Sequence, residues 1–292
     1  MTMTAPGALR QLLGSSRPVS WINTAFPFGA AYLMAGGSVD AAFVVGVLYF
    51  LIPYNLLMYG LNDVFDYESD LRNPRKGSIE GVVLDRRWHR TTIWAAVLSN
   101  LPFLVALVAM GTAASTIVLT VSVFAVLAYS VPVLRFKERP LLDSATSSTH
   151  FVSPAVFGLV LAGGEASTTA LAALGGFFLW GMASQAFGAV QDVTADREAA
   201  IASVATWLGA ARTVWLSMAL YAAAGVVVLG TGWPGGLAGL LVVPYIVSIA
   251  PFRSVPDAES EVANRGWRRF LWLNIVTGFL VTQLLIWVAM TR

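Results

Sequence analysis

Apolar residues fill long, closely spaced stretches that cover most of the chain. Each stretch approaches the ~20 residues that a helix needs to cross the hydrocarbon core of a bilayer. About nine such stretches run over residues 18–36, 41–64, 92–111, 115–134, 142–162, 168–191, 210–230, 234–252 and 268–290. Short turns marked by Gly or Pro alternate between them with longer charged loops. The pattern predicts an all-α membrane protein, a bundle of about nine transmembrane helices that forms a single domain over residues 1–292.

Composition agrees with a protein that has lipid as its solvent. Apolar residues make up 57% of the 292 residues and charged residues only 12%, whereas soluble domains carry about 25% charged residues. The chain has no cysteine, which excludes disulfides, thiol catalysis and cysteine metal sites. The basic residues do not cluster on a soluble face, so we expect membrane lipid and no nucleic acid among the partners. The first 17 residues are mixed and polar and do not form a signal peptide pattern.

The basic residues fall on one side of the predicted bundle. If the N-terminus lies in the cytoplasm, every Lys and Arg except Arg292 falls on the cytoplasmic side. The positive-inside rule then predicts a multi-pass protein of the bacterial cytoplasmic membrane, with the N-terminus inside and the C-terminus outside.

The second apolar stretch ends in an acidic segment. At 100° per residue, a helix brings Asp63, Asp66 and Asp70 within an arc of about 60°, whereas Glu68 points about 140° away. Carboxylates this close repel one another, and the cost rises beside a membrane. Mg²⁺ bridging to a diphosphate relieves the repulsion, because Mg²⁺ prefers hard oxygen ligands. A solvated helix end is the alternative interpretation.

The sixth apolar stretch ends in a second acidic pair. Asp192 and Asp196 are four residues apart and share one helix face. Alone, such a pair is weak evidence, but the predicted topology places it on the same cytoplasmic side as the first cluster. We therefore predict that both clusters converge through Mg²⁺ on one diphosphate, in an active site that opens near the cytoplasmic face.

The two motifs and the helix count resemble the UbiA-type intramembrane prenyltransferases. The first motif reads N-D-x-x-D-x-x-x-D and the second D-x-x-x-D. The resemblance implies that both motifs hold Mg²⁺ and the diphosphate of an isoprenoid donor. The matching residues are Asn62, Asp63, Asp66, Asp70, Asp192 and Asp196. Ala195 stands where some members carry Gly, which affects the local turn and not the metal ligands.

Basic residues follow the first motif and the fourth apolar stretch. Arg72, Lys76, Arg135 and Lys137 are candidates for binding the diphosphate, together with Asn62, because Arg and Lys are the usual phosphate partners. The segment Tyr-Ser-x-Pro before Arg135 also resembles the family. The alternative for each basic residue is the general bias of cytoplasmic loops.

Several polar residues are expected to line a substrate cavity. These are Asn23, Asn55, Tyr59, Tyr129, Asp143 and Gln185. Polar groups inside a membrane bundle are costly, and hydrogen bonding between helices is the alternative role. The aromatic faces of Tyr54, Tyr59 and Tyr129 could stabilise an allylic carbocation by cation–π attraction.

A narrower resemblance concerns the acceptor. Residues 17–27, the triplet 53–55 and the segment LNDVFDYESDLRNPRKG at 61–77 are similar to bacterial lycopene elongases. This implies transfer of a dimethylallyl group from its diphosphate to lycopene or a related carotene in fifty-carbon carotenoid synthesis. The alternatives are an aromatic or quinone precursor, or a glyceryl lipid, as acceptor. Outside this class, a membrane transporter or a scaffold protein is the alternative.

Overall fold

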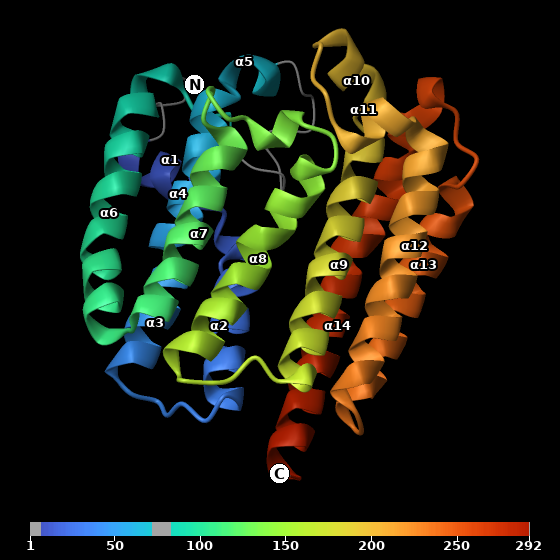
Figure 1. Cartoon of the computed structure of the whole chain (residues 1–292). Helices are drawn as coiled ribbons and strands as arrows, with labels where there is room; N and C mark the ends of the chain where they lie inside the picture. The colour runs from blue at the N-terminus through green and yellow to red at the C-terminus, as the bar shows by residue number, and fades with distance from the viewer. Residues whose placement is uncertain (1–6, 72–82, 292) are drawn as a thin grey trace. The chain divides into compact units, whose positions relative to one another are not determined.

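The computed structural model describes residues 7–71 and 83–291, and every regular element in these ranges is a helix (Figure 1). The chain forms two compact units. The first consists of Met1–Arg135 and Ser153–Gly164, and the second of Phe136–Val152 and Glu165–Arg292. Each unit is described by itself.

The first unit packs its helices around an aromatic core. Its α-helices are α1 (Ala8–Ser15), α2 (Ile22–Met34), α3 (Ala41–Leu51), α4 (Pro53–Phe65), α5 (Tyr67–Asp70), α6 (His89–Met110), α7 (Ala113–Ser130) and the last part of α8 (Leu142–Leu161). Two 3₁₀ turns, η1 (Pro18–Ser20) and η2 (Arg86–Trp88), precede α2 and α6. Phe28 lies with its ring centroid 5.3 Å from that of Phe50 and 5.9 Å from that of Phe157. Gly158 lets α8 approach α2, because a Cβ there would collide with the Phe28 carbonyl oxygen.

The second predicted span is broken in its middle. Residues 41–64 form α3 and α4, and the break lies at Ile52, just before Pro53, which lacks an N–H and cannot continue the hydrogen-bond ladder. Asn55 Nδ2 donates to the carbonyls of Phe50 (2.8 Å) and Leu51 (3.1 Å) and to Thr24 Oγ1 (2.7 Å). The side chain therefore satisfies carbonyls that the proline break frees, as membrane helices require.

The second unit is also helical. It contains the first part of α8, α9 (Thr168–Val190), α10 (Val193–Glu198), α11 (Val204–Leu208), α12 (Ala210–Val228), α13 (Val242–Ile249) and α14 (Asn264–Met290). Its 3₁₀ turns are η3 (Phe136–Glu138), η4 (Leu229–Thr231), η5 (Gly235–Leu241), η6 (Ala250–Phe252) and η7 (Asp257–Ala263). The rings of Tyr221 and Tyr245 stack with centroids 5.3 Å apart in its core. The hydroxyl groups of Ser184 and Tyr221 are hydrogen-bonded at 2.9 Å, so the buried phenol has a polar partner inside the apolar bundle.

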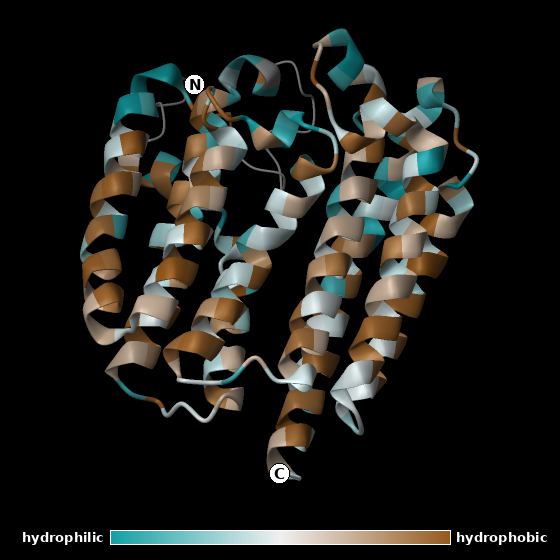
Figure 2. Ribbon diagram, viewed as in Figure 1, coloured by the Kyte–Doolittle hydropathy of each residue, from teal (hydrophilic) through white to brown (hydrophobic). Residues whose placement is uncertain are grey.

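Within the described residues, seven helical segments are long and apolar enough to cross a bilayer. They are Ala41–Phe65, Arg86–Met110, Ala113–Ser130, Thr168–Val190, Ala210–Thr231, Gly235–Phe252 and Asp257–Met290. Figure 2 shows apolar colour along α6 and α7 and polar colour over α10. The chain is therefore a multi-pass helical membrane protein, as the sequence predicts.

The other two predicted stretches are less typical spans. Residues 18–36 contain α2, which has only 13 residues. Residues 142–162 coincide with α8, which has 20 residues but carries the polar run from Asp143 to His150. The count of about nine spans therefore stays a prediction, as does the single domain.

Candidate functional site

The first aspartate motif lies where α4 ends. Helix α4 stops at Phe65, Asp66 caps it with non-helical backbone angles (φ −102°, ψ 5°), and the short helix α5 follows. The helical-wheel prediction that three carboxylates share one face assumes a continuous helix. It therefore applies to Asp63 and Asp66 but not to Asp70, which lies beyond the break. The Asp63 residue is fully buried and Asp70 is 7% exposed. Glu68 does not join these carboxylates: its side chain is exposed, and its carboxylate pairs with Arg86 at 3.1 Å.

Arg17 holds the most deeply buried carboxylate of the motif. Its Nη2 lies 3.2 Å from Asp63 Oδ1, and its guanidinium carbon lies 4.3 Å from the centroid of the Tyr59 ring. A buried carboxylate without a counter-charge costs several kcal/mol, and Arg17 supplies that charge. Tyr59, predicted to line the cavity, is therefore the aromatic partner of this arginine.

Local sequence fixes the position of Arg17. It follows α1 and precedes Pro18, and a residue before proline is disfavoured in the right-handed helical region. Arg17 adopts φ 49° and ψ 73°, a left-handed conformation. Trp21 Nε1 donates to the Ser16 carbonyl at 3.0 Å and fastens the turn. Left-handed non-glycine residues are strained and concentrate at functional sites.

Arg135 pairs with Asp66 much as Arg17 pairs with Asp63. Helix α7 ends at Ser130, ahead of Pro132, and Arg135 then adopts φ 39°. Its Nη2 lies 3.6 Å from Asp66 Oδ1, with the two side chains 28% and 12% exposed. Two arginines with left-handed backbones therefore neutralise two aspartates of the first motif.

The other predicted diphosphate-binding residues are placed differently. Arg72 and Lys76 lie outside the described residues. Asn62 is half-buried in the last turn of α4, and its carbonyl accepts from the Asp66 N–H at 2.9 Å. Lys137 belongs to η3 of the second unit and is half-buried.

The second aspartate motif lies at the break between α9 and α10. Gln191 caps α9, Asp192 is the N-cap residue of α10, and the Asp196 N–H donates to the Asp192 carbonyl at 2.8 Å. Both aspartates are half-buried. Asn264 Nδ2 donates to Gln191 Oε1 at 2.6 Å, which ties the end of α9 to the start of α14.

Asp257, which the sequence analysis does not single out, organises the loop after this motif. Its carboxylate accepts from Arg197 Nη1 and from the Ala210 N–H, both at 2.6 Å. Its carbonyl accepts from Thr194 Oγ1 at 3.0 Å. One residue of η7 therefore joins α10 to the first turn of α12.

The remaining predicted cavity residues have varied surroundings. Asp143 is buried, and its carboxylate accepts from the N–H groups of Ser144 (2.7 Å) and Val204 (2.8 Å). Gln185 Oε1 accepts from Ser147 at 2.9 Å. Asn55 stabilises the break described above. Asn23 is exposed and Tyr129 is half-buried.

All candidate metal ligands in both motifs are carboxylate oxygens. This donor set fits Mg²⁺, which is usually bound through one or two carboxylates together with waters and substrate phosphates. Within the described ranges, no three acidic or histidine side chains converge on a common metal position. The first motif belongs to the first unit and the second motif to the second unit, so their convergence stays a prediction.

Comparison with known proteins gives concordant matches over most of the chain. The profile of the UbiA prenyltransferase family matches residues 24–276. The chain is 54% identical over 278 residues to a lycopene elongase/hydratase of Corynebacterium glutamicum, covering 95% of this chain and 97% of that protein. It is 55% identical over 283 residues to a C(50) beta-cyclic carotenoids biosynthesis protein of a Dietzia species, covering 97% of this chain but 66% of that protein. The chain thus spans about two thirds of the Dietzia protein.

Solved structures share the fold. A UbiA homolog from Archaeoglobus fulgidus bound to DMAPP and Mg²⁺ superposes with a TM-score of 0.65 at 18% identity, covering 91% of this chain and 98% of that one. An apo UbiA homolog from Aeropyrum pernix gives a TM-score of 0.62 at 18% identity, covering 89% and 98%.

Proposed function

The chain belongs to the UbiA prenyltransferase family, and from this premise we propose that it transfers a dimethylallyl group from its diphosphate to lycopene or a related carotene, with Mg²⁺. It is thus a membrane prenyltransferase, which removes the transporter and scaffold alternatives. The observation that carries the choice of acceptor is the 54–55% identity, over almost the whole chain, to proteins named for lycopene elongation and C50 carotenoid synthesis.

The proposed metal ligands are the carboxylates of both motifs. They are Asp63, Asp66, Asp70, Asp192 and Asp196. When bound, Mg²⁺ withdraws electron density from the diphosphate and so weakens the allylic C–O bond. Support for the first motif comes from its burial, because a carboxylate such as Asp63 at the end of an apolar helix is costly without a function.

The basic residues are proposed to bind the leaving diphosphate. Arg17 and Arg135 are the counter-ions of Asp63 and Asp66. With Mg²⁺ bound to those carboxylates, the two guanidinium groups would be available to phosphate oxygens, which arginines bind through paired N–H donors. Asn62, Arg72, Lys76 and Lys137 complete the proposed diphosphate set.

The proposed transfer breaks one carbon–oxygen bond of the donor and forms one carbon–carbon bond to the acceptor. The allylic C–O bond breaks, and its electron pair leaves with the diphosphate. A terminal double bond of the polyene attacks the allylic carbocation and forms the new C–C bond. The resulting carbocation then loses a proton, or it takes up water, which releases a proton and leaves a hydroxyl group. Tyr129, which is half-buried, is proposed to stabilise the positive charge through its aromatic face.

Pigment analysis tests the acceptor. The protein is expressed in cells that accumulate lycopene, and the pigments are examined by mass spectrometry. We expect mass gains of one or two five-carbon units, with or without water. Unchanged lycopene beside a prenylated quinone precursor or glyceryl lipid would show that the acceptor is wrong.

Matched variants test the site separately. Asp63→Asn and Asp192→Asn remove one carboxylate each, whereas Glu68→Gln removes an exposed carboxylate from the same segment as Asp63. We expect the two Asn variants to lose transfer and Glu68→Gln to keep it. If both Asn variants stay active, the assignment of the motifs is wrong whatever the acceptor.

A further inference from the structure

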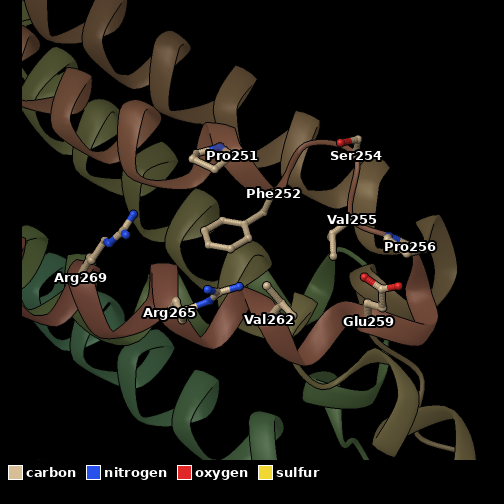
Figure 3. A pocket seen from close by; sticks show the side chains of 9 residues that line it. All are labelled: Pro251, Phe252, Ser254, Val255, Pro256, Glu259, Val262, Arg265 and Arg269. Carbon is tan, nitrogen blue, oxygen red and sulfur yellow. The ribbon is translucent and has the colours of Figure 1, made fainter.

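A pocket of about 430 Å³ lies at the start of α14 in the second unit. Figure 3 shows it between the loop at 251–256 and the helix that carries Arg265 and Arg269. The volume is within the range of small-ligand sites. The Phe252 ring packs on Phe187 with centroids 6.0 Å apart and forms the apolar floor. Gly266 permits this packing, because a Cβ there would come within 2.7 Å of both rings.

Two guanidinium groups give the pocket its charge. Arg265 and Arg269 are one helical turn apart and exposed. Neither forms an ion pair with any described residue. Glu259 is the acidic residue of the lining, and Figure 3 shows it at the opposite end from Arg269. The lining therefore carries two arginines and one glutamate, an excess of one positive charge.

An apolar stripe continues from these arginines along α14. Trp272, Val276 and Phe279 follow Arg265 and Arg269 at alternating spacings of three and four residues, which keeps all five on one helix face. These three apolar side chains are 73%, 55% and 62% exposed. The segment belongs to the candidate membrane span Asp257–Met290. A charged pocket at the start of α14 thus leads directly onto an exposed apolar face of the same helix.

We propose that this pocket binds the phosphate headgroup of an anionic phospholipid whose acyl chains lie along the stripe of Trp272, Val276 and Phe279. Arginine pairs bind phosphate through parallel N–H donors, and basic pockets at the ends of membrane helices suit anionic headgroups. A free anion would use the arginines only. An amphiphile uses both the charge and the apolar stripe.

The side chains that line the proposed lipid site are not those of the aspartate motifs. Asn264, which ties α14 to Gln191 beside the second motif, points about 100° away from Arg265 and about 140° from Arg269 on the helix wheel. The proposal therefore does not rest on the proposed function, and its test does not require prenyl transfer.

Native mass spectrometry of the purified full chain in neutral detergent tests the site. The protein is mixed with phosphatidylglycerol, or with phosphatidylcholine of the same acyl chains, and thermal stability is measured in parallel. The variants are Arg265→Gln, Arg269→Gln and the double variant. Arg268→Gln is the matched control, because Arg268 is exposed on the same turn but does not line the pocket.

We expect selective phosphatidylglycerol adducts on the wild type, weakened about tenfold by loss of each pocket arginine, and unchanged in Arg268→Gln. Equal binding of the two lipids, or equal loss in Arg268→Gln, would refute a specific site. Equal stabilisation by inorganic phosphate at the same concentration would indicate a free-anion site. A dimer that only the double variant loses would show that a second copy covers the pocket, and would also overturn the proposal.

Discussion

The Arg17 guanidinium lies 3.2 Å from the Asp63 carboxylate, which is fully buried, and joins the turn before α2 to the end of α4. Because the arginine is 21% exposed, the pair is partly screened by solvent. Replacing Arg17 with Gln leaves a buried carboxylate without this counter-charge. We expect Arg17→Gln to lower the free energy of unfolding by about 1–3 kcal/mol without Mg²⁺, measured by thermal or denaturant unfolding in detergent.

Two further variants separate charge from packing at this pair. Arg17→Gln combined with Asp63→Asn removes both charges and should recover much of the lost stability, because neither partner of this ion pair is left behind. Arg10→Gln removes an exposed charge from α1 and should have little effect. Equal destabilisation by Arg10→Gln would assign the effect to net charge and not to the pair.

Each motif is expected to contribute to transfer. Asp63→Asn and Asp192→Asn keep the shape of the side chain but weaken metal binding. We expect each to reduce the rate of prenyl transfer by about 10²-fold or more, measured as release of diphosphate or as prenylated product. If only one variant loses activity, a single motif, and not two converging motifs, binds the diphosphate.

Mg²⁺ should stabilise the protein independently of activity. A ligand at 100 times its dissociation constant stabilises the folded state by about 2.7 kcal/mol. We expect Mg²⁺ with a diphosphate to raise the melting temperature of the wild type, and EDTA to reverse the shift and stop transfer. Asp63→Asn should show a much smaller shift, and Glu68→Gln should respond like the wild type.

Most of the membrane architecture can be predicted from the sequence, because apolar length alone defines a span. The predicted stretches 92–111 and 168–191, for example, coincide with α6 and α9. The breaks are harder to predict. Pro27 and Pro102 lie inside helices, whereas Pro53 separates α3 from α4. Whether a proline bends or breaks a helix depends on contacts such as the hydrogen bond from Asn55 to Thr24, which tertiary structure supplies.

The chemistry of the site is predicted less completely than the fold. Clustered aspartates at helix ends are visible in sequence because acids are costly beside lipid. Arg17 is visible as a basic residue of the predicted cytoplasmic side and as the first residue of the stretch 17–27, but its pairing with Asp63 is not, because the two residues are 46 positions apart. Its place before Pro18, at the start of the first apolar stretch, is a local signal for an unusual backbone conformation. The role of Asp257 depends on the fold of η7 against α10, which no local pattern predicts.

The two asparagines predicted to line the cavity should behave differently. Asn55 is buried and bonded to two carbonyls at the α3–α4 break, whereas Asn23 is exposed. We expect Asn55→Ala to lower the free energy of unfolding by about 1–3 kcal/mol with little change in the donor KM, measured by unfolding and steady-state kinetics. Asn23→Ala should leave stability unchanged. A higher donor KM without lost stability in Asn55→Ala would favour the cavity role instead.

Asp257 should act as a positioning residue for the second motif. Its carboxylate accepts from the Ala210 N–H at the start of α12 and from Arg197, the neighbour of Asp196. Asp257→Ala removes a carboxylate from a helix N-terminus, so we expect a loss of about 1 kcal/mol in stability. We also expect a higher donor KM, because α10 is less firmly held.

The conservative variant separates the two contacts of Asp257. Asp257→Asn keeps an acceptor for the Ala210 N–H but loses the charge that pairs with Arg197. Compared with Asp257→Ala, this variant should regain most of the lost free energy of unfolding, whereas its donor KM should stay raised. Unfolding and steady-state kinetics measure the two quantities. Glu261→Ala, an exposed acid of the same 3₁₀ turn, serves as the control. A fall in kcat alone, with KM unchanged, would argue against a role in holding the donor and for one in the chemical step.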